Sequence, residues 1–201
     1  MSDHGTSRRD MLKAAVGAAA VAALPITPAD AERAMAHVEA ALAQQAQGTA
    51  YTPQYFTPDE WKQVGVMADL IIPKDEKSGS ATDAGVPQYM DFFCVEYASS
   101  HAWVRDALRW FDGFAYDSFH KAFNNCTDAE RRQLFDQVAW PAKAKPELRE
   151  GVNFFNRFRD FTAGGFFSSK MGVADIGYMG NHALASWNGC PPDALKHLGV
   201  G

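Results

Sequence analysis

Residues 56–73 read FTPDEWKQVGVMADLIIP, and they contain the most complete helix signal in the chain. Thr57 can cap a helix, Pro58 suits its first position, and Glu60 stands three residues after the cap, as a capping box requires. Pro73 cannot continue the helix. Apolar side chains recur between these limits at helical spacing, at Trp61, Val64, Ala68 and Ile71. The stretch therefore predicts an amphipathic helix with one buried face.

Further helices are predicted on the C-terminal side of this one. One begins at Pro87, and another, over residues 102–124, has aromatic residues on several faces, which indicates a central position. Thr127 and Glu130 form a second capping box at the start of a third helix. Before Pro87, residues 73–87 form a polar loop whose length favours a functional role or packing against another surface.

The last predicted helix covers residues 147–162 and ends at Gly164-Gly165, because glycine weakens a helix. From Phe166 to Gly201 the chain is rich in Gly and Pro and shows no period. No segment alternates in the manner of a β-strand. The sequence thus predicts a mainly α protein, a single helical domain with an irregular Gly/Pro-rich C-terminal segment.

Aromatic residues divide the chain into two parts. All of its 14 Phe, 6 Tyr and 5 Trp residues lie between Tyr51 and Trp187. With 47% hydrophobic residues among 201, the chain can form a buried core. Its formal net charge of −5 argues against nucleic-acid binding, which normally requires a basic surface.

The aromatic-free part begins with a predicted signal peptide, residues 1–31. Arg8-Arg9 precedes an Ala-rich apolar run over residues 14–24, and Ala29-Asp30-Ala31 supplies the small residues that a signal peptidase requires. The paired arginines resemble the twin-arginine export signal, although Met11 replaces its usual aromatic residue. The export signal predicts a periplasmic protein. Because the apolar run is too short to span a membrane, we expect no transmembrane segment in the chain itself. An ordinary amphipathic N-terminal helix is the alternative.

The next segment, residues 32–50, is predicted to be an Ala-rich helical arm, and residues 51–201 are predicted to form one helical domain. The arm has little apolar bulk to bury, and Gly48 ends its helix. Its composition fits either a packed first helix or an arm that lies on a partner.

No familiar cofactor motif occurs in the chain. There is no glycine-rich dinucleotide fingerprint, no P-loop, no C-x-x-C, no H-E-x-x-H and no G-x-S-x-G. No two histidines stand three or four residues apart, so a helical metal site has no support. We therefore expect no catalytic, cofactor-binding or metal-binding residues. Since the twin-arginine route carries folded proteins, often with a cofactor inserted, the cofactor is expected on a second chain; an unfamiliar site in this chain is the alternative.

Three cysteines, Cys94, Cys126 and Cys190, follow the leader. In an oxidising compartment an odd number leaves one cysteine that is free, buried and inert, or paired with another chain. Cys190 stands in the sequence Gly-Cys-Pro-Pro at residues 189–192. It is the candidate for an inter-subunit disulfide.

The aromatic residues fit a core, but several stand in segments without a helical stripe. Protein interfaces are enriched in such residues. We therefore expect a surface that binds a larger partner. The candidate interface residues are Tyr55, Phe56, Trp61, Phe166, Phe167, Tyr178 and Trp187.

Several sequence blocks occur in the order found in one known family. They are FTPDEW at 56–61, ADLIIP at 68–73, SGSATDAGVP at 78–87, AWP at 139–141, FF at 154–155, RDFT at 159–162, GFFSS at 165–169, GYMGN at 177–181 and WNGCP at 187–191. Together with the leader, they resemble the gluconate 2-dehydrogenase subunit 3 family, the small (gamma) subunit of bacterial flavin-dependent sugar dehydrogenases.

This resemblance implies a non-catalytic subunit. The implied partner is a larger FAD-containing oxidoreductase of the glucose–methanol–choline type, often without a signal of its own, and a cytochrome c subunit with haem c is a further expected partner. The small subunit is expected to escort the flavoprotein through export and to stabilise it in a heterodimer. Two alternatives stay open, an independent exported helical enzyme with an unrecognised cofactor or metal site, and a periplasmic small-ligand binding module.

Overall fold

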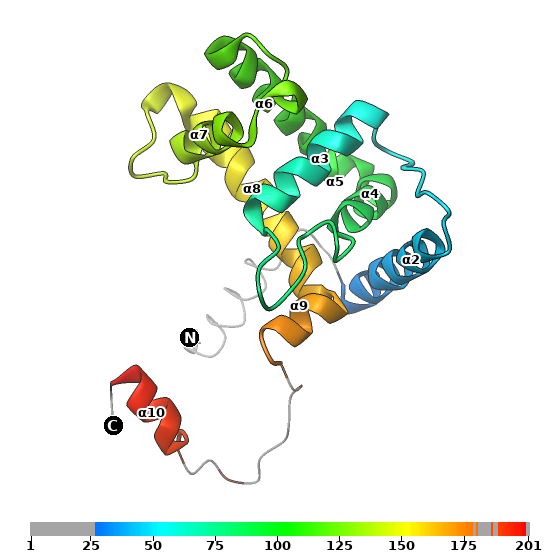
Figure 1. The fold of residues 1–201 in the computed structure, drawn as a ribbon, viewed down its shortest axis with the longest axis vertical. Helices are drawn as coiled ribbons and strands as arrows, with labels where there is room; N and C mark the ends of the chain where they lie inside the picture. Colours follow the sequence, from blue (N-terminus) through cyan, green and yellow to red (C-terminus); the bar gives the residue numbers. More distant parts are fainter. Residues whose placement is uncertain (1–26, 179, 181–185, 187–188, 200–201) are drawn as a thin grey trace, which may run out of the picture.

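The mainly α fold class is confirmed in a computed structural model that describes residues 27–178, 180, 186 and 189–199, among which there is no β-strand. Figure 1 shows the helices in chain order. The α-helices are α2 (Pro28–Ala46), α3 (Pro58–Ile71), α4 (Val86–Glu96), α5 (Ala98–His101), α6 (Trp103–Phe119), α7 (Asp128–Val138), α8 (Arg149–Ser168), α9 (Lys170–Asp175) and α10 (Pro192–Leu198). Two short 3₁₀ turns, Phe123–Asn125 and Pro146–Leu148, precede α7 and α8.

The helix starts follow the capping signals in the sequence. In α3 the backbone N–H of Glu60 donates to Thr57 Oγ1 at 3.3 Å, and the N–H of Thr57 donates to Glu60 Oε2 at 2.9 Å. Thr127 and Glu130 repeat this reciprocal pair in α7. Each pair satisfies two backbone donors that the first turn leaves without an intrahelical partner. Both predicted capping boxes are therefore confirmed.

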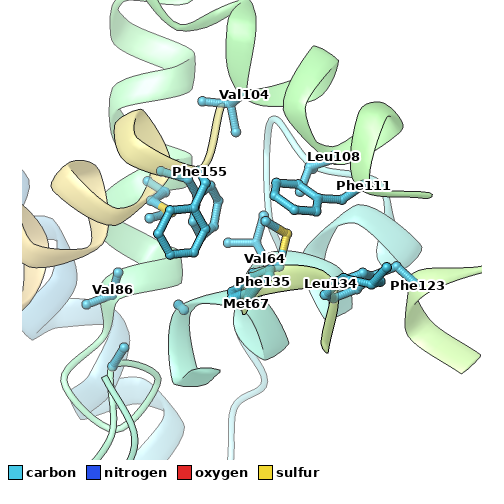
Figure 2. Packing of buried hydrophobic residues seen from close by; sticks show 14 of the residues in the cluster. Val64, Met67, Val86, Val104, Leu108, Phe111, Phe123, Leu134, Phe135 and Phe155 are labelled. Carbon is cyan, nitrogen blue, oxygen red and sulfur yellow. The ribbon is translucent and has the colours of Figure 1, made fainter. Parts of the chain in front are cut away.

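The main core lies where α3, α4, α6, α7 and α8 meet. Its aromatic side chains pack in tilted, stacked and edge-to-face pairs; Phe135 and Phe155 pack edge to face, with ring centroids 5.2 Å apart. α6 contacts α3, α7 and α8, in agreement with its predicted central position. Figure 2 shows the side chains that converge there: Val64 and Met67 from α3, Leu108 and Phe111 from α6, Leu134 and Phe135 from α7, and Phe155 from α8.

Helix α8 continues through Gly164-Gly165 to Ser168, so the predicted helix end at these glycines was wrong. Gly165 faces Tyr89 of α4, and a Cβ atom at Gly165 would lie 2.9 Å from Tyr89 Cδ1. The glycine therefore permits a close approach of α8 to α4 instead of ending the helix. As a result, Phe166 belongs to α8 and is buried.

Helix α2 packs against α4, as the packed alternative for the predicted arm requires. Ala34, Val38 and Ala41 are buried, and Ala34 and Val38 form a second cluster with Tyr89 and Phe93. The helix begins at Pro28 with Thr27 as its cap. The predicted boundary at residue 31 therefore falls within the first turn of α2.

A buried carboxylate on α4 holds the segment that leads into α3. Asp91 is 1% exposed. It accepts hydrogen bonds from the Tyr51 hydroxyl at 2.8 Å and from the backbone N–H groups of Gln54 and Tyr55, each at 2.9 Å. The Tyr51 hydroxyl also lies 3.0 Å from Nε2 of His37 on α2. Asp91 thus fixes both α2 and the entry to α3 on α4.

Candidate interaction surface

Two hollows lie on either side of α3, which Figure 1 places between α7 on one side and α4 and α2 on the other. The first, the polar cleft, has a volume of about 370 Å³. The second, the α7 groove, has a volume of about 250 Å³. The polar cleft is lined chiefly by Gln45, Trp61, Lys62, Asp69, Thr82 and Gln88. The α7 groove is lined chiefly by Leu70, Ile71, Arg132, Phe135, Phe155 and Arg159.

The walls of the polar cleft are fixed by local contacts. Trp61 stands in the first turn of α3 and stacks on Tyr51, with ring centroids 5.2 Å apart and an interplanar angle of 27°. Asp69 accepts two hydrogen bonds from Thr82, from its backbone N–H at 2.8 Å and from its hydroxyl at 2.7 Å. These bonds hold the polar loop after α3 against α3 itself. The loop therefore packs on its own chain and forms one wall of the cleft.

Gln88 lines the cleft beside Gln45. The residue is 4% exposed, and its Nε2 donates to Gln45 Oε1 at 3.0 Å. Its Oε1 is buried and has no hydrogen-bond partner among the described residues. Because this oxygen has no contact with solvent, it does not open into the cleft.

The α7 groove has an apolar floor and a charged rim. Phe135 and Phe155 are buried core residues whose outer edges line the groove, while Arg132, Asp136 and Arg159 stand exposed at its border. Arg159 pairs with Asp160 at 2.8 Å, a surface contact that contributes little to stability. The groove therefore combines apolar area with charges of both signs.

Trp140 does not line the α7 groove itself but directly follows the lining residue Ala139 in the chain. Its side chain is 61% exposed, and the Lys143 ammonium lies 5.7 Å from its ring centroid. An exposed Trp beside an apolar groove is typical of protein interfaces. Sequence reasoning did not select Trp140 as an interface residue; its position after the last turn of α7 and before Pro141 was the available signal.

The predicted interface residues fall into three groups. Phe167 and Tyr178 are exposed, at 44% and 51%, and Trp61 and Tyr55 are partly buried, with the Arg105 guanidinium 4.3 Å from the Tyr55 ring centroid. Trp187 lies outside the described residues. Phe56 and Phe166 are 4% and 1% exposed and pack in the core of the chain itself, so they offer no surface to a partner, which corrects their place in the predicted interface.

None of the three cysteines forms a disulfide within the described part of the chain. Cys94 and Cys126 are buried, and burial raises the pKa of each thiol, which keeps them protonated. Cys190 is exposed. A disulfide from Cys190 to another subunit stays a prediction.

Neither a metal site nor a membrane span is found within residues 27–178 and the short described stretches after them. No three His, Cys, Asp or Glu side chains in this part of the chain gather closely enough to hold a metal ion. No helix there is long and apolar enough to cross a membrane. His101 is buried among aromatic rings, and this burial lowers its pKa, although its Nδ1 lies 3.1 Å from the Tyr97 carbonyl oxygen.

The fold defines a helical protein with two surface hollows on either side of α3. A family model described as gluconate 2-dehydrogenase subunit 3 matches residues 58–185, and the chain belongs to this family. It is therefore a small subunit of a dehydrogenase complex. The matched range includes every lining residue of the two hollows named above except Gln45. No curated protein and no solved structure matches the chain.

Proposed function

We propose that this chain is the non-catalytic small subunit of a periplasmic FAD-dependent sugar or polyol dehydrogenase. It binds the glucose–methanol–choline-type flavoprotein, stabilises it and escorts it through twin-arginine export. The family match carries the proposal, because a subunit of a dehydrogenase complex needs a surface that binds a larger partner subunit. The exposed Trp140 and the adjoining α7 groove supply a surface of that kind.

Trp140 is the proposed centre of this contact. Trp and Arg dominate the binding energy of protein interfaces, where large side chains enter pockets that exclude water. The Trp140 ring has apolar area to bury, and the groove beside it accepts an apolar side chain of the flavoprotein. The rim carries Arg132 and Asp136, which favours charges of both signs on the border of that partner.

Stabilisation of the partner follows from mass action. A subunit that binds only the folded flavoprotein lowers the population of its unfolded form, by an amount that grows with the concentration of the free subunit relative to Kd. Because residues 1–31 are predicted to be a twin-arginine signal, a flavoprotein without its own signal would cross the membrane in this folded complex. A cytochrome c subunit that accepts the electrons completes the proposed assembly.

Co-expression tests the escort role. The FAD-containing dehydrogenase subunit of the same organism is expressed with the full chain, with an Arg8→Lys/Arg9→Lys variant, and alone. Flavin content and dye-linked dehydrogenase activity are then measured in periplasmic and cytoplasmic fractions. We expect both in the periplasm only with the unchanged chain. Equal periplasmic activity in all three strains would refute the escort role.

A second measurement separates stabilisation from export. The cytoplasmic flavoprotein is heated with and without the purified full chain, and its flavin release is followed by fluorescence. We expect release at a higher temperature in the presence of the chain, with a shift that grows with chain concentration. A release temperature that does not depend on the chain would contradict stabilisation while leaving export open to the first experiment.

A further inference from the structure

We propose that the first turn of α2 belongs to the mature subunit, and that the folded chain protects the bond between Ala31 and Glu32 from signal peptidase. The leader is then removed at a bond before Thr27 or is kept. This inference rests on the proposed function, because a chain that folds before export meets the peptidase with α2 already formed.

The conformation of the predicted cleavage site is the first argument. A signal peptidase reads small side chains at two positions before the bond that it cuts, here Ala29 and Ala31. In an extended chain, side chains two residues apart lie on the same face. In a helix they lie about 200° apart around the axis, because successive residues are about 100° apart. Both alanines belong to the first turns of α2, so they present no common face to the peptidase.

The second argument is the set of backbone hydrogen bonds at the site. The N–H of Thr27 donates to Asp30 Oδ2 at 3.0 Å, and the N–H of Asp30 donates to Thr27 Oγ1 at 3.2 Å, which completes a capping box. The N–H of Ala31 donates to the Thr27 carbonyl oxygen at 3.1 Å. The segment therefore becomes extended only when these hydrogen bonds break.

Side chains also connect this turn to the end of α4. The Arg33 guanidinium donates through Nη2 to Asp30 Oδ1 at 3.0 Å and to the Tyr97 hydroxyl at 3.3 Å. Its Nη1 donates to Glu96 Oε2 at 3.3 Å. Each of these exposed contacts contributes little by itself. Together they link the residue before the cleavage site to a helix that is distant in the sequence.

Burial of α2 begins directly after the predicted cleavage site. Ala34 follows Ala31 by three residues, is fully buried, and packs with Val38 against Tyr89 and Phe93 of α4. A peptidase that straightens the chain on both sides of its bond would pull Ala34 out of this cluster. Opening of the site thus breaks apolar contacts as well as hydrogen bonds, which makes the open form a minor population.

Cleavage after Ala31 would also leave α2 incomplete. The product would begin at Glu32 and would lack the capping box of Thr27 and Asp30. Its new α-amino group would place a positive charge at the helix N-terminus, where the helix dipole disfavours it. A mature chain that begins at or before Thr27 avoids both losses.

A cleavage reaction with purified components tests the proposal. The full chain is purified from the cytoplasm and incubated with bacterial signal peptidase in detergent micelles, and intact mass spectrometry identifies each product. Ala34→Asp places a charge in the contact between α2 and α4 and should release α2. Thr27→Ala removes a cap without changing residues 29–31, and Thr127→Ala, which removes the equivalent cap of α7, is its matched control. Circular dichroism gives the melting temperature of each chain.

We expect the wild type to yield the product that begins at Glu32 about a hundredfold more slowly than Ala34→Asp, because cutting follows the population of the open form. Thr27→Ala should yield it about fivefold faster than the wild type, and Thr127→Ala at the wild-type rate. Equal rates for the wild type and Ala34→Asp, or no cut after Ala31 in either, would overturn the proposal. Equal acceleration in Thr27→Ala and Thr127→Ala would also overturn it, because cutting would then follow global unfolding.

The mass of the exported chain separates this inference from the proposed function. In the co-expression strain with the unchanged chain, the periplasmic chain should begin at or before Thr27. A periplasmic chain that begins at Glu32 would overturn the inference and leave the escort role intact. A chain that stays in the cytoplasm would contradict the export role, and the reaction with purified peptidase, which needs no export, would still decide the cleavage site.

Discussion

The polar cleft and the α7 groove flank the same helix but arise in different ways. The groove exposes the outer edges of core side chains, such as Phe135 and Phe155. The cleft depends instead on hydrogen bonds between distant segments, from Thr82 to Asp69 and from Gln88 to Gln45. The shape of the groove is thus set by the core, whereas the shape of the cleft is set by these polar contacts.

Among the variants that compare the two hollows, Trp140→Ala is expected to cause the largest loss of affinity for the flavoprotein. Truncation of a central interface Trp costs about 2–4 kcal/mol of binding energy, which is roughly 30- to 1,000-fold in Kd. Stability of the free chain should stay within about 0.5 kcal/mol, because the side chain is exposed. Tyr116→Ala is the matched control, since Tyr116 is also 61% exposed and lines neither hollow. Equal binding by both variants in calorimetry would remove the groove from the interface.

Gly165→Ala should disturb both hollows together, because it separates α8, which lines the groove, from α4, which lines the cleft. The new Cβ would lie 2.9 Å from Tyr89 Cδ1, and overpacking of this kind costs about 1–3 kcal/mol. Gly164→Ala is the control, because its Cβ would lie 3.8 Å from the Tyr89 hydroxyl, an ordinary contact. The control should gain about 0.5–1 kcal/mol from helix propensity. Urea unfolding that gives both variants the same sign would contradict the close contact.

Arg132→Glu should weaken binding of the flavoprotein by an amount that depends on the salt concentration. Reversal of a rim charge mainly slows association, so we expect up to about a tenfold loss of affinity at low salt and a smaller loss at physiological salt. Arg149→Glu is the control outside the groove. The loss caused by Trp140→Ala should hardly depend on salt, since it removes apolar contact area and no charge. Surface plasmon resonance at two salt concentrations makes the comparison, and identical salt dependence for both variants would contradict it.

The smallest expected effect is a pH dependence of the stability of the free chain, to which the residues of neither hollow contribute. Burial lowers the pKa of His101, so the folded chain resists protonation while the unfolded chain binds a proton near the ordinary value of 6.5. Below that pH the unfolded state holds more protons, and stability falls as the pH decreases from about 7 to about 5. The carboxylates with lowered pKa, such as Glu60, lose their contribution only at lower pH.

His101→Phe should flatten the pH dependence of the melting temperature in this range, whatever its effect on the absolute value. Phe93 and Phe161 surround the position, so an aromatic replacement keeps the packing. The affinity for the flavoprotein should change little over the same range, because no histidine lines either hollow. An unchanged slope in the variant would assign the pH dependence to other groups.

Local signals in the sequence were sufficient for most of the fold. Thr57 with Glu60, and Thr127 with Glu130, fixed two helix starts because a capping box depends only on residues three positions apart. Gly165 was misread because its role depends on Tyr89, which lies far away in the sequence and faces it only after α4 and α8 have packed.

The site residues that sequence reasoning missed share this dependence on distant partners. Gln88 became notable only when the structure left its Oε1 without a partner, and a glutamine in a helix gives no such signal by itself. Asp91 looked like any polar residue in an apolar helix until residues 51–56 were seen to donate to it. Composition divided the chain at residue 50, but it could not show that α2 packs on α4, and it could not tell buried Phe56 from exposed Phe167.

The hydrogen bonds to Asp91 also set an order of events during synthesis. Tyr51 and Phe56 bind a carboxylate that is 40 and 35 positions later in the chain. At roughly 5–20 residues per second, a ribosome needs about 2–8 s to cover that distance. During this interval α2 has no α4 to pack on, and the predicted export signal just before it emerges first. The N-terminal part of the chain therefore reaches its native arrangement only after α4 has been made.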